Sequence, residues 1–277
     1  MERRFACIAC GKCCHGWLPL TLADALAHAG RFPLAIIWSP IRQGSKAFGI
    51  TAKLGLTLTV KGHKPLAVRI TPTAYLPPAL PCPALTADGL CAIHDSKPQR
   101  CRTMPFFPWQ EERDQGENLI PRPGWLCETK GEAPVVYRDR AIIERQDFER
   151  ERATLLAEAP LLRSYAEAVV KAAPGIAQAV AISASKPGGG HVPLKISPLL
   201  MRLDGIDRAE IAAQQIAVLT TYAERVADRP ELAEYRRTWT LWAKDLERLL
   251  IIKTPAFGDI KTPAFGDQGA TLDPPGA

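Results

Sequence analysis

The chain has 277 residues with a formal net charge of +6, and 47% of its residues are hydrophobic. This length and apolar content suffice for one large domain or two small ones. No run of about 18 apolar residues occurs, which excludes a predicted membrane span. The N-terminus also lacks the apolar core and cleavage site of a signal peptide, so we expect a cytoplasmic protein.

The net positive charge comes entirely from the first half of the chain. Residues 1–135 contain 16 Lys and Arg against 10 Asp and Glu, whereas the remainder contains 19 of each. All eight cysteines lie in the same half, and their thiolates would more than offset the excess. We expect the basic residues to balance an anionic metal site. Nucleic-acid binding is not favoured, because no basic run with interleaved aromatic residues occurs.

The first feature along the chain is the motif Cys7-x-x-Cys10-x-x-Cys13-Cys14. In a reducing compartment, clustered thiols usually hold metal or perform redox chemistry rather than form disulfides. Each C-x-x-C step brings two thiolates to one side of a turn, so three ligands converge. The side chains of Cys13 and Cys14 cannot both reach one ion easily. The pair therefore favours a polynuclear cluster, or two neighbouring sites, over a single tetrahedral zinc.

Regular structure is predicted next. Thr21–Arg31 should form a short helix that is capped by its first residue and ended by Gly30. Ile50–Val60 and Leu66–Thr71 contain β-branched and apolar residues, and they are predicted as strands of a hairpin that turns at Lys61–Lys64.

A second cysteine block begins at Cys82. Eight residues separate Cys82 from Cys91, nine separate Cys91 from Cys101, and 25 separate Cys101 from Cys127. These spacings are too long for a local zinc knuckle, so the thiols must converge through the fold. Arg100 flanks Cys101 on one side and another arginine follows it, and positive charge there favours thiolates.

The remainder is predicted to be helical. Arg140–Ala173 has apolar residues at helical spacing and should be split by Pro160. Lys186–His191 is predicted as a flexible loop. Asp207–Leu250 should form two helices that are broken near residues 228–230, where Asp228 is a candidate cap for the second.

The predicted fold class is α+β, with a loop-rich cysteine-cluster metal module followed by an α-helical subdomain. Residues 1–135 form the predicted metal-binding domain and residues 136–252 the helical subdomain. Residues 253–277 are predicted as a disordered tail. The octapeptide IKTPAFGD occurs twice in succession, at 252–259 and 260–267, and a duplication this short does not indicate a repeat fold.

The candidate metal ligands are the cysteines of both blocks. They are Cys7, Cys10, Cys13, Cys14, Cys82, Cys91, Cys101 and Cys127. His15 adjoins Cys14 and His94 lies close to Cys91 in the sequence, and both are predicted to support the ligands or to lie at the surface rather than to bind metal.

These motifs together resemble a known family. The sequence C-x-x-C-x-x-C-C is followed by C-P-x-L, G-x-C-x-I-H and K-P-x-x-C-R-x-x-P-F, in that order. This arrangement closely resembles the YkgJ-like CxxCxxCC family of zinc- or iron-chelating proteins, over about residues 5–130. The resemblance implies metal binding, usually as an iron–sulfur cluster. One branch with a similar module is the flagellin lysine methylases, in which such a cluster accompanies methyl transfer.

Three functions are consistent with the sequence. The leading hypothesis is a 4Fe-4S iron–sulfur protein with a redox or accessory role and a protein or redox partner that the sequence does not identify. The first alternative is a structural zinc module that presents an interaction surface. The second is a cluster-dependent modifying enzyme, such as a lysine N-methylase. No motif for a specific reaction is present, neither G-x-G-x-x-G nor G-x-S-x-G nor H-E-x-x-H.

Overall fold

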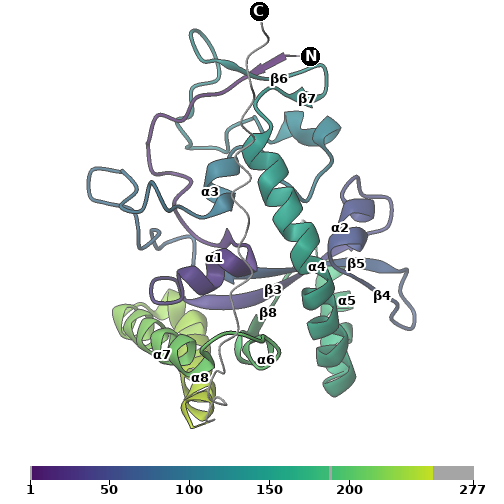
Figure 1. Ribbon diagram of the computed structural model, residues 1–277, viewed down its shortest axis with the longest axis vertical. Helices are drawn as coiled ribbons and strands as arrows, with labels where there is room; N and C mark the ends of the chain where they lie inside the picture. The colour runs from purple at the N-terminus through teal and green to yellow at the C-terminus, as the bar shows by residue number, and fades with distance from the viewer. Residues whose placement is uncertain (1, 187–188, 252–277) are drawn as a thin grey trace, which may run out of the picture.

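The computed structural model describes residues 2–186 and 189–251, so the duplicated octapeptide and the predicted tail lie outside the described residues. The fold is mixed α+β, as predicted from the sequence. A five-stranded antiparallel sheet lies near the middle of the molecule, and helices pack around it (Figure 1). Its strands are β2 (Leu18–Pro19), β3 (Leu34–Arg42), β4 (Leu56–Leu58), β5 (Leu66–Ala74) and β8 (Val192–Lys195).

The centre of this sheet is the long antiparallel pair of β3 and β5. The two strands pair over their full lengths, from Leu34 opposite Ala74 to Arg42 opposite Leu66. The first seven residues of β3 are all buried, so the strand is covered on both faces. A strand buried in this way has no apolar–polar alternation. The sequence pattern therefore does not indicate β3.

The predicted hairpin is present, but the strand prediction is wrong for the first half of Ile50–Val60. Residues Phe48–Leu54 form helix α2, and only β4 pairs with β5. Gly55 separates helix from strand, and a Cβ atom at this position would lie 2.1 Å from the carbonyl oxygen of Val68. The change from helix to strand therefore depends on a glycine that lets two backbones approach closely.

The first predicted helix is confirmed as α1 (Leu22–Ala27). The hydroxyl oxygen of Thr21 accepts a hydrogen bond from the backbone N–H of Asp24 at 3.0 Å, which is the predicted N-cap. Two further N–H groups of this helix donate to a residue from far along the chain. The Glu158 carboxylate accepts from Leu22 N at 2.9 Å and from Ala23 N at 3.2 Å.

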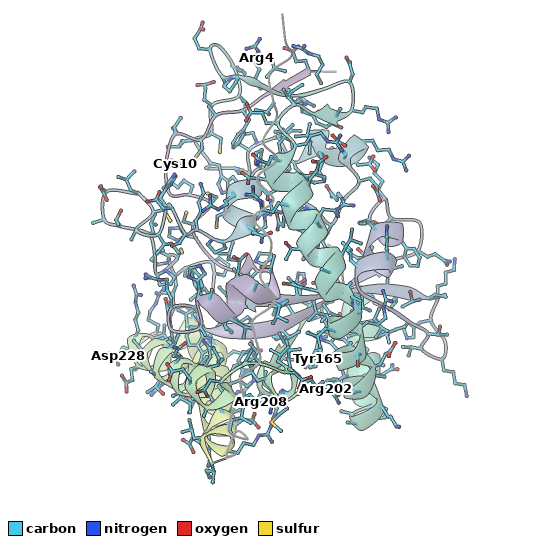
Figure 2. The ribbon with its side chains drawn as sticks, viewed as in Figure 1. Arg4, Cys10, Tyr165, Arg202, Arg208 and Asp228 are labelled. Carbon is cyan, nitrogen blue, oxygen red and sulfur yellow. The ribbon has the colours of Figure 1, made fainter. Side chains whose placement is uncertain are left out.

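Glu158 belongs to α4 (Gln146–Ala172), which was predicted as two helices. The predicted break at Pro160 is wrong, because α4 continues through it. Pro160 is exposed, so the hydrogen bond that proline removes is lost on the solvent side, while neighbouring residues such as Leu162 and Tyr165 bury their side chains in the core. Helix α5 (Gly175–Ala184) follows, and Figure 2 labels Tyr165 on α4.

Glu158 gives a testable pH dependence. Burial raises the pKa of its carboxyl to about 7, and the two backbone hydrogen bonds only partly oppose this shift. The folded state therefore favours the protonated carboxyl. The stability that this group contributes is lost as the pH rises from its pKa in the unfolded chain, about 4.3, through its pKa in the folded protein. We expect the free energy of unfolding of Glu158→Gln, relative to that of the wild-type protein, to rise by about 2 kcal/mol between pH 5 and pH 8, as measured by urea unfolding.

The exposed Glu167 on the same helix provides the matched Glu→Gln control. A stability difference between Glu158→Gln and the wild-type chain that is the same at both pH values would contradict this account.

The C-terminal region contains the two predicted helices, α7 (Arg208–Arg225) and α8 (Ala233–Leu250), preceded by the short α6 (Ser197–Leu200). The helices α7 and α8 lie side by side at the lower left of Figure 1. The prediction that Asp228 caps α8 is wrong, since this helix begins without a side-chain cap after the 3-10 turn η2 (Pro230–Leu232). It is Asp207, at the start of α7, that accepts a hydrogen bond, from Glu210 N at 2.9 Å.

The C-terminal region is not purely helical, because β8 joins the central sheet by pairing with β3. The main hydrophobic cluster accordingly contains Phe32 and Trp38 together with Trp239 and Leu246. Buried Gln215 of α7 also accepts a hydrogen bond from Leu34 N at 2.9 Å. Sheet and C-terminal helices therefore share one core.

A smaller sheet joins the N-terminus to the middle of the chain. Its strands are β1 (Glu2–Arg4), β6 (Val135–Arg138) and β7 (Ala141–Ile142), and the 3-10 helix η1 (Glu112–Glu117) lies beside it. Tyr137 is buried here, and its hydroxyl donates to the carbonyl of Glu112 at 3.0 Å. Among the described helices, none is both long enough and apolar enough to span a bilayer.

Candidate metal centre

The eight cysteines come from the N-terminal loop, the segment that begins at Cys82, helix α3 (Gln99–Thr103), and the loop that contains Cys127. All eight are free thiols, with Cys7 and Cys13 exposed and the others half-buried. Figure 2 labels Cys10 in this region.

Left-handed backbone shapes the N-terminal cysteine loop. Gly11 has φ +68° and Gly16 has φ +75°, and the non-glycine Ala9 also has a positive φ of 54°. A Cβ atom on Gly11 would lie 3.2 Å from Leu85 of the second block, so the two cysteine segments are in close contact. A left-handed alanine is unfavourable for an L-residue and is common near functional sites.

Four cysteines form an inner group: Cys14, Cys82, Cys91 and Cys101. The backbone joins the first two, since Cys82 N donates to Cys14 O at 2.8 Å. An isolated antiparallel bridge places Leu85 opposite Cys91 and folds Cys91 back toward Cys82. Burial raises the pKa of Cys101 to about 12, and the negative charges of Cys82 and Cys91 act in the same direction. The four thiols are therefore close enough to affect one another's ionisation.

The other four cysteines form an outer group: Cys7, Cys10, Cys13 and Cys127. Ala6 and Glu128 make an antiparallel backbone pair with N···O distances of 2.8 and 3.1 Å, which places Cys7 near Cys127. Burial raises the pKa of the Cys127 thiol, and the charges of Cys10, Cys13 and Cys7 raise it further. Cys127 had the most isolated position in the sequence, and the fold brings it to the N-terminal motif.

The adjacent pair Cys13 and Cys14 connects the two groups. The Cys14 thiol donates a hydrogen bond to Cys13, which lowers the pKa of Cys13 to about 6 and raises that of Cys14. Cys14 is also affected by the charges of Cys82 and Cys101, whereas the charge of Cys13 acts on both Cys127 and Cys101. The two successive cysteines therefore link the two groups.

Helix α3 (Gln99–Thr103), which carries Cys101, is fixed at both ends by distant residues. Gln99 N donates to the carboxylate of Asp24 in α1 at 2.9 Å. The Thr103 hydroxyl donates to the carbonyl of Asp147 in α4 at 3.3 Å. A five-residue helix has little stability of its own, so these contacts determine where Cys101 lies.

A buried ion pair lies directly beside Cys101. Arg100 Nη1 is 3.4 Å from Glu151 Oε2, and both side chains are only 5% exposed. Arg100 also donates to the carbonyl of Phe106 and lies over the ring of Phe107. The sequence suggested that Arg100 would favour thiolates. Its charge does lower the pKa of Cys101, but burial and the neighbouring thiolates have the larger combined effect.

The two histidines lie beside the cysteine segments through backbone contacts. His15 forms an isolated backbone bridge with Pro81, and His94 N donates to Cys91 O at 3.1 Å. Within residues 2–186 and 189–251, no three His, Cys, Asp or Glu side chains are arranged to hold a metal ion. A single tetrahedral zinc requires its sulfurs to converge within about 2.3 Å of one point.

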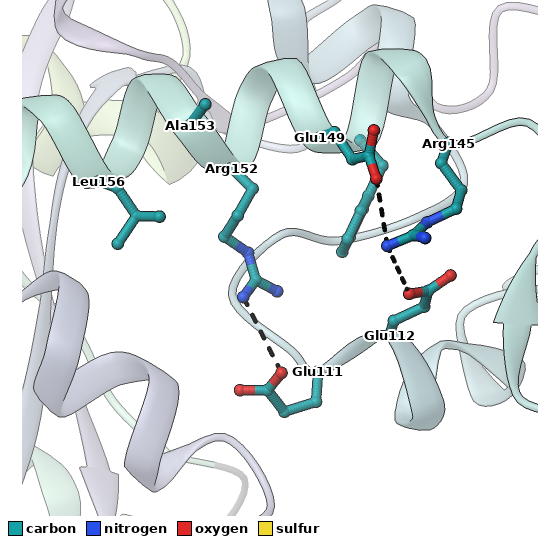
Figure 3. Close-up of a pocket in the computed structure, with 8 residues that line it drawn as sticks. Glu111, Glu112, Arg145, Glu149, Arg152, Ala153 and Leu156 are labelled. Carbon is teal, nitrogen blue, oxygen red and sulfur yellow. Dashed lines mark ion pairs between the residues drawn. The ribbon is translucent and has the colours of Figure 1, made fainter.

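A recess of about 330 Å³ elsewhere on the surface contains paired charges (Figure 3). Arg145 bridges Glu112 and Glu149 at 3.1 Å each, and Arg152 lies 4.0 Å from Glu111. Partly exposed pairs of this kind contribute little to stability. We interpret this recess as a solvated ion-pair network.

No protein-family model, curated protein or solved structure matches the chain.

Proposed function

We propose that this chain is a cytoplasmic metal-binding protein that holds an iron–sulfur cluster through its cysteines and has a redox or accessory role. The observation that carries the proposal is that eight free thiols from distant segments lie close enough for their charges to act on one another's pKa. The motif resemblance to the YkgJ-like family supports the same reading. Thiolates are the usual ligands of iron–sulfur clusters.

The inner group offers the donor set of a cluster. Its four donors are all sulfur, and their charges act on one another's pKa. A polynuclear cluster binds each thiolate to a different iron, and the adjacent pair Cys13 and Cys14 favours such a cluster over a single zinc ion. The residues that would hold it are Cys14, Cys82, Cys91 and Cys101.

The outer group offers a second set of four thiols, of which Cys7 and Cys13 are exposed. A bound cluster would supply one-electron transfer at a potential set by charge, hydrogen bonds and solvent access. The chain's own contribution is to fix the thiols. Two glycines shape the N-terminal loop, and Asp24 and Glu151 hold the helix that carries Cys101.

The test is anaerobic purification followed by analysis of iron, zinc and acid-labile sulfide, with a visible spectrum before and after dithionite. We expect a brown protein with iron and sulfide in near-equal amounts and a broad visible band that bleaches on reduction. A colourless protein with stoichiometric zinc and no sulfide would overturn the redox proposal. It would favour the structural zinc module instead, since zinc has no redox chemistry.

A further inference from the structure

A second recess, of about 340 Å³, lies where helix α7 passes the turn that follows α1. Its lining comes from three segments of the chain: residues 30–31 of that turn, Pro83 of the second cysteine block, and one face of α7. Two of the lining residues are arginines, Arg31 from the turn and Arg225 from the helix. Two cations therefore reach one recess from positions that are far apart in the sequence.

The charges of this recess are not balanced, in contrast to those of the recess in Figure 3. There, each arginine has a glutamate at 4.0 Å or less. Here the described lining contains no Asp or Glu, and neither Arg31 nor Arg225 forms an ion pair within the part of the chain that the structure describes. Two like charges at one recess repel each other, and an anion between them would reverse this effect.

A buried side chain fixes the turn that carries Arg31 against the helix that carries Arg225. The side-chain amide of Gln215, in α7, donates to the carbonyl of Phe32 at 2.8 Å and also to the carbonyl of Ala29. Gln215 is fully buried. The backbones of the two arginines are therefore held in place before any ligand arrives, which reduces the entropy lost on binding.

The effects of the two arginines on neighbouring groups show where their charges lie. Burial raises the pKa of Tyr222, the charge of Arg225 opposes that rise, and the charge of Cys82 adds to it. Burial also raises the pKa of Cys82, and the charge of Arg31 is among the effects that lower it. Both guanidinium groups therefore lie near the side of the recess that Tyr222 and Cys82 border.

The remaining lining is largely apolar. Val218 and Tyr222 are buried, with 9% and 5% of their surfaces exposed, and Pro83 is half-buried. Arg31 and Arg225 are both exposed, so charge lies at the rim and apolar surface lies below it. Binding sites for small molecules commonly combine an apolar lining with a few polar groups that fix the orientation of the ligand.

We propose that Arg31 and Arg225 form a binding site for a small organic dianion. Its phosphate, or its pair of carboxylates, lies between the two guanidinium groups, and its carbon skeleton lies against Val218 and Pro83. A planar guanidinium matches the two oxygens of a carboxylate or a phosphate. The lining of the recess includes no cysteine, so this proposal can fail or succeed independently of the metal that the chain holds.

The test is calorimetric titration of the full-length protein, purified without oxygen, with phenyl phosphate and with succinate. Phenyl phosphate carries its charge on one group and succinate on two, so the two probes separate a phosphate site from a dicarboxylate site. We expect saturable binding of at least one probe to the wild-type chain. Arg31→Gln and Arg225→Gln should each weaken that binding by about tenfold, because each removes a charge-assisted contact.

Both arginines are exposed, so these variants should retain the fold, which urea unfolding checks. Arg225→Lys keeps the charge but lacks the planar fork, and it should bind with intermediate affinity. Arg237→Gln is the matched control, because Arg237 is an exposed arginine of α8 that does not line the recess. The proposal is overturned if neither probe binds the wild-type protein or if either glutamine variant at the recess binds as the wild-type protein does. A loss of affinity in Arg237→Gln as large as that in the recess variants also overturns it.

Discussion

Cys101→Ser is expected to remove the cluster of the inner group, whereas Cys127→Ser should leave that cluster in place. Serine differs from cysteine by one atom, but a neutral hydroxyl is a poor ligand for iron compared with a thiolate. The charges of Cys82, Cys91 and Cys13 act on the pKa of Cys101, while those of Cys10, Cys13 and Cys7 act on the pKa of Cys127. The measurement is iron and sulfide per chain, together with the electron paramagnetic resonance signal of the reduced protein.

The paired variants serve as controls for each other, because both replace a half-buried cysteine in a loop-rich region. Unfolding by urea checks that each variant retains the fold. Equal loss of iron in both variants would show that the eight thiols act as one site. No loss in Cys101→Ser would remove the inner group as the cluster ligands.

Glu151→Ala is expected to destabilise the protein by about 3–5 kcal/mol, because it leaves the buried Arg100 without its partner. The pair is already poorly satisfied. Arg100 Nε and Nη1 and Glu151 Oε2 are buried without hydrogen-bond partners in the described structure. The contact at 3.4 Å is therefore mainly one of charge. Because Arg100 neighbours Cys101 on α3, metal content should fall together with stability.

Two variants test this explanation. The double variant Arg100→Met with Glu151→Leu removes both charges and should recover most of the lost stability, since buried ion pairs are often replaceable by apolar residues. Glu149→Ala, on the same helix, breaks an exposed pair with Arg145 and should cost less than about 1 kcal/mol. Urea unfolding gives all three values. A double variant as unstable as Glu151→Ala would mean that the carboxylate acts through some contact other than Arg100.

The sequence was most informative where a single local signal decides the structure. Thr21 caps α1 as predicted, and the helical periodicity of residues 207–250 gave α7 and α8. It failed where tertiary contacts decide. β3 and β8 have no alternating pattern to indicate a strand, and Pro160 is tolerated in α4 because the hydrogen bond it removes faces solvent. These outcomes depend on what each segment is packed against, which one sequence does not reveal.

The candidate site shows the same division. The cysteine residues themselves could be named from their spacing. Their arrangement into an inner and an outer group could not, because it depends on backbone pairs such as Cys14 with Cys82. Glu151 carried no signal, since it lies in a helix rich in charge. Its role comes from its burial beside Arg100.

The placement of β8 has a consequence for the order of events during synthesis. The ribosome releases the cysteine loops early, but β3 obtains its partner on the β8 side only when residues 192–195 emerge, and Trp239 reaches the shared core later still. Contacts between such distant parts of a chain form slowly, because a long loop must close first. The nascent thiols therefore remain without their native scaffold through most of translation. If the thiols hold a cluster as proposed, its insertion should follow the emergence of β8.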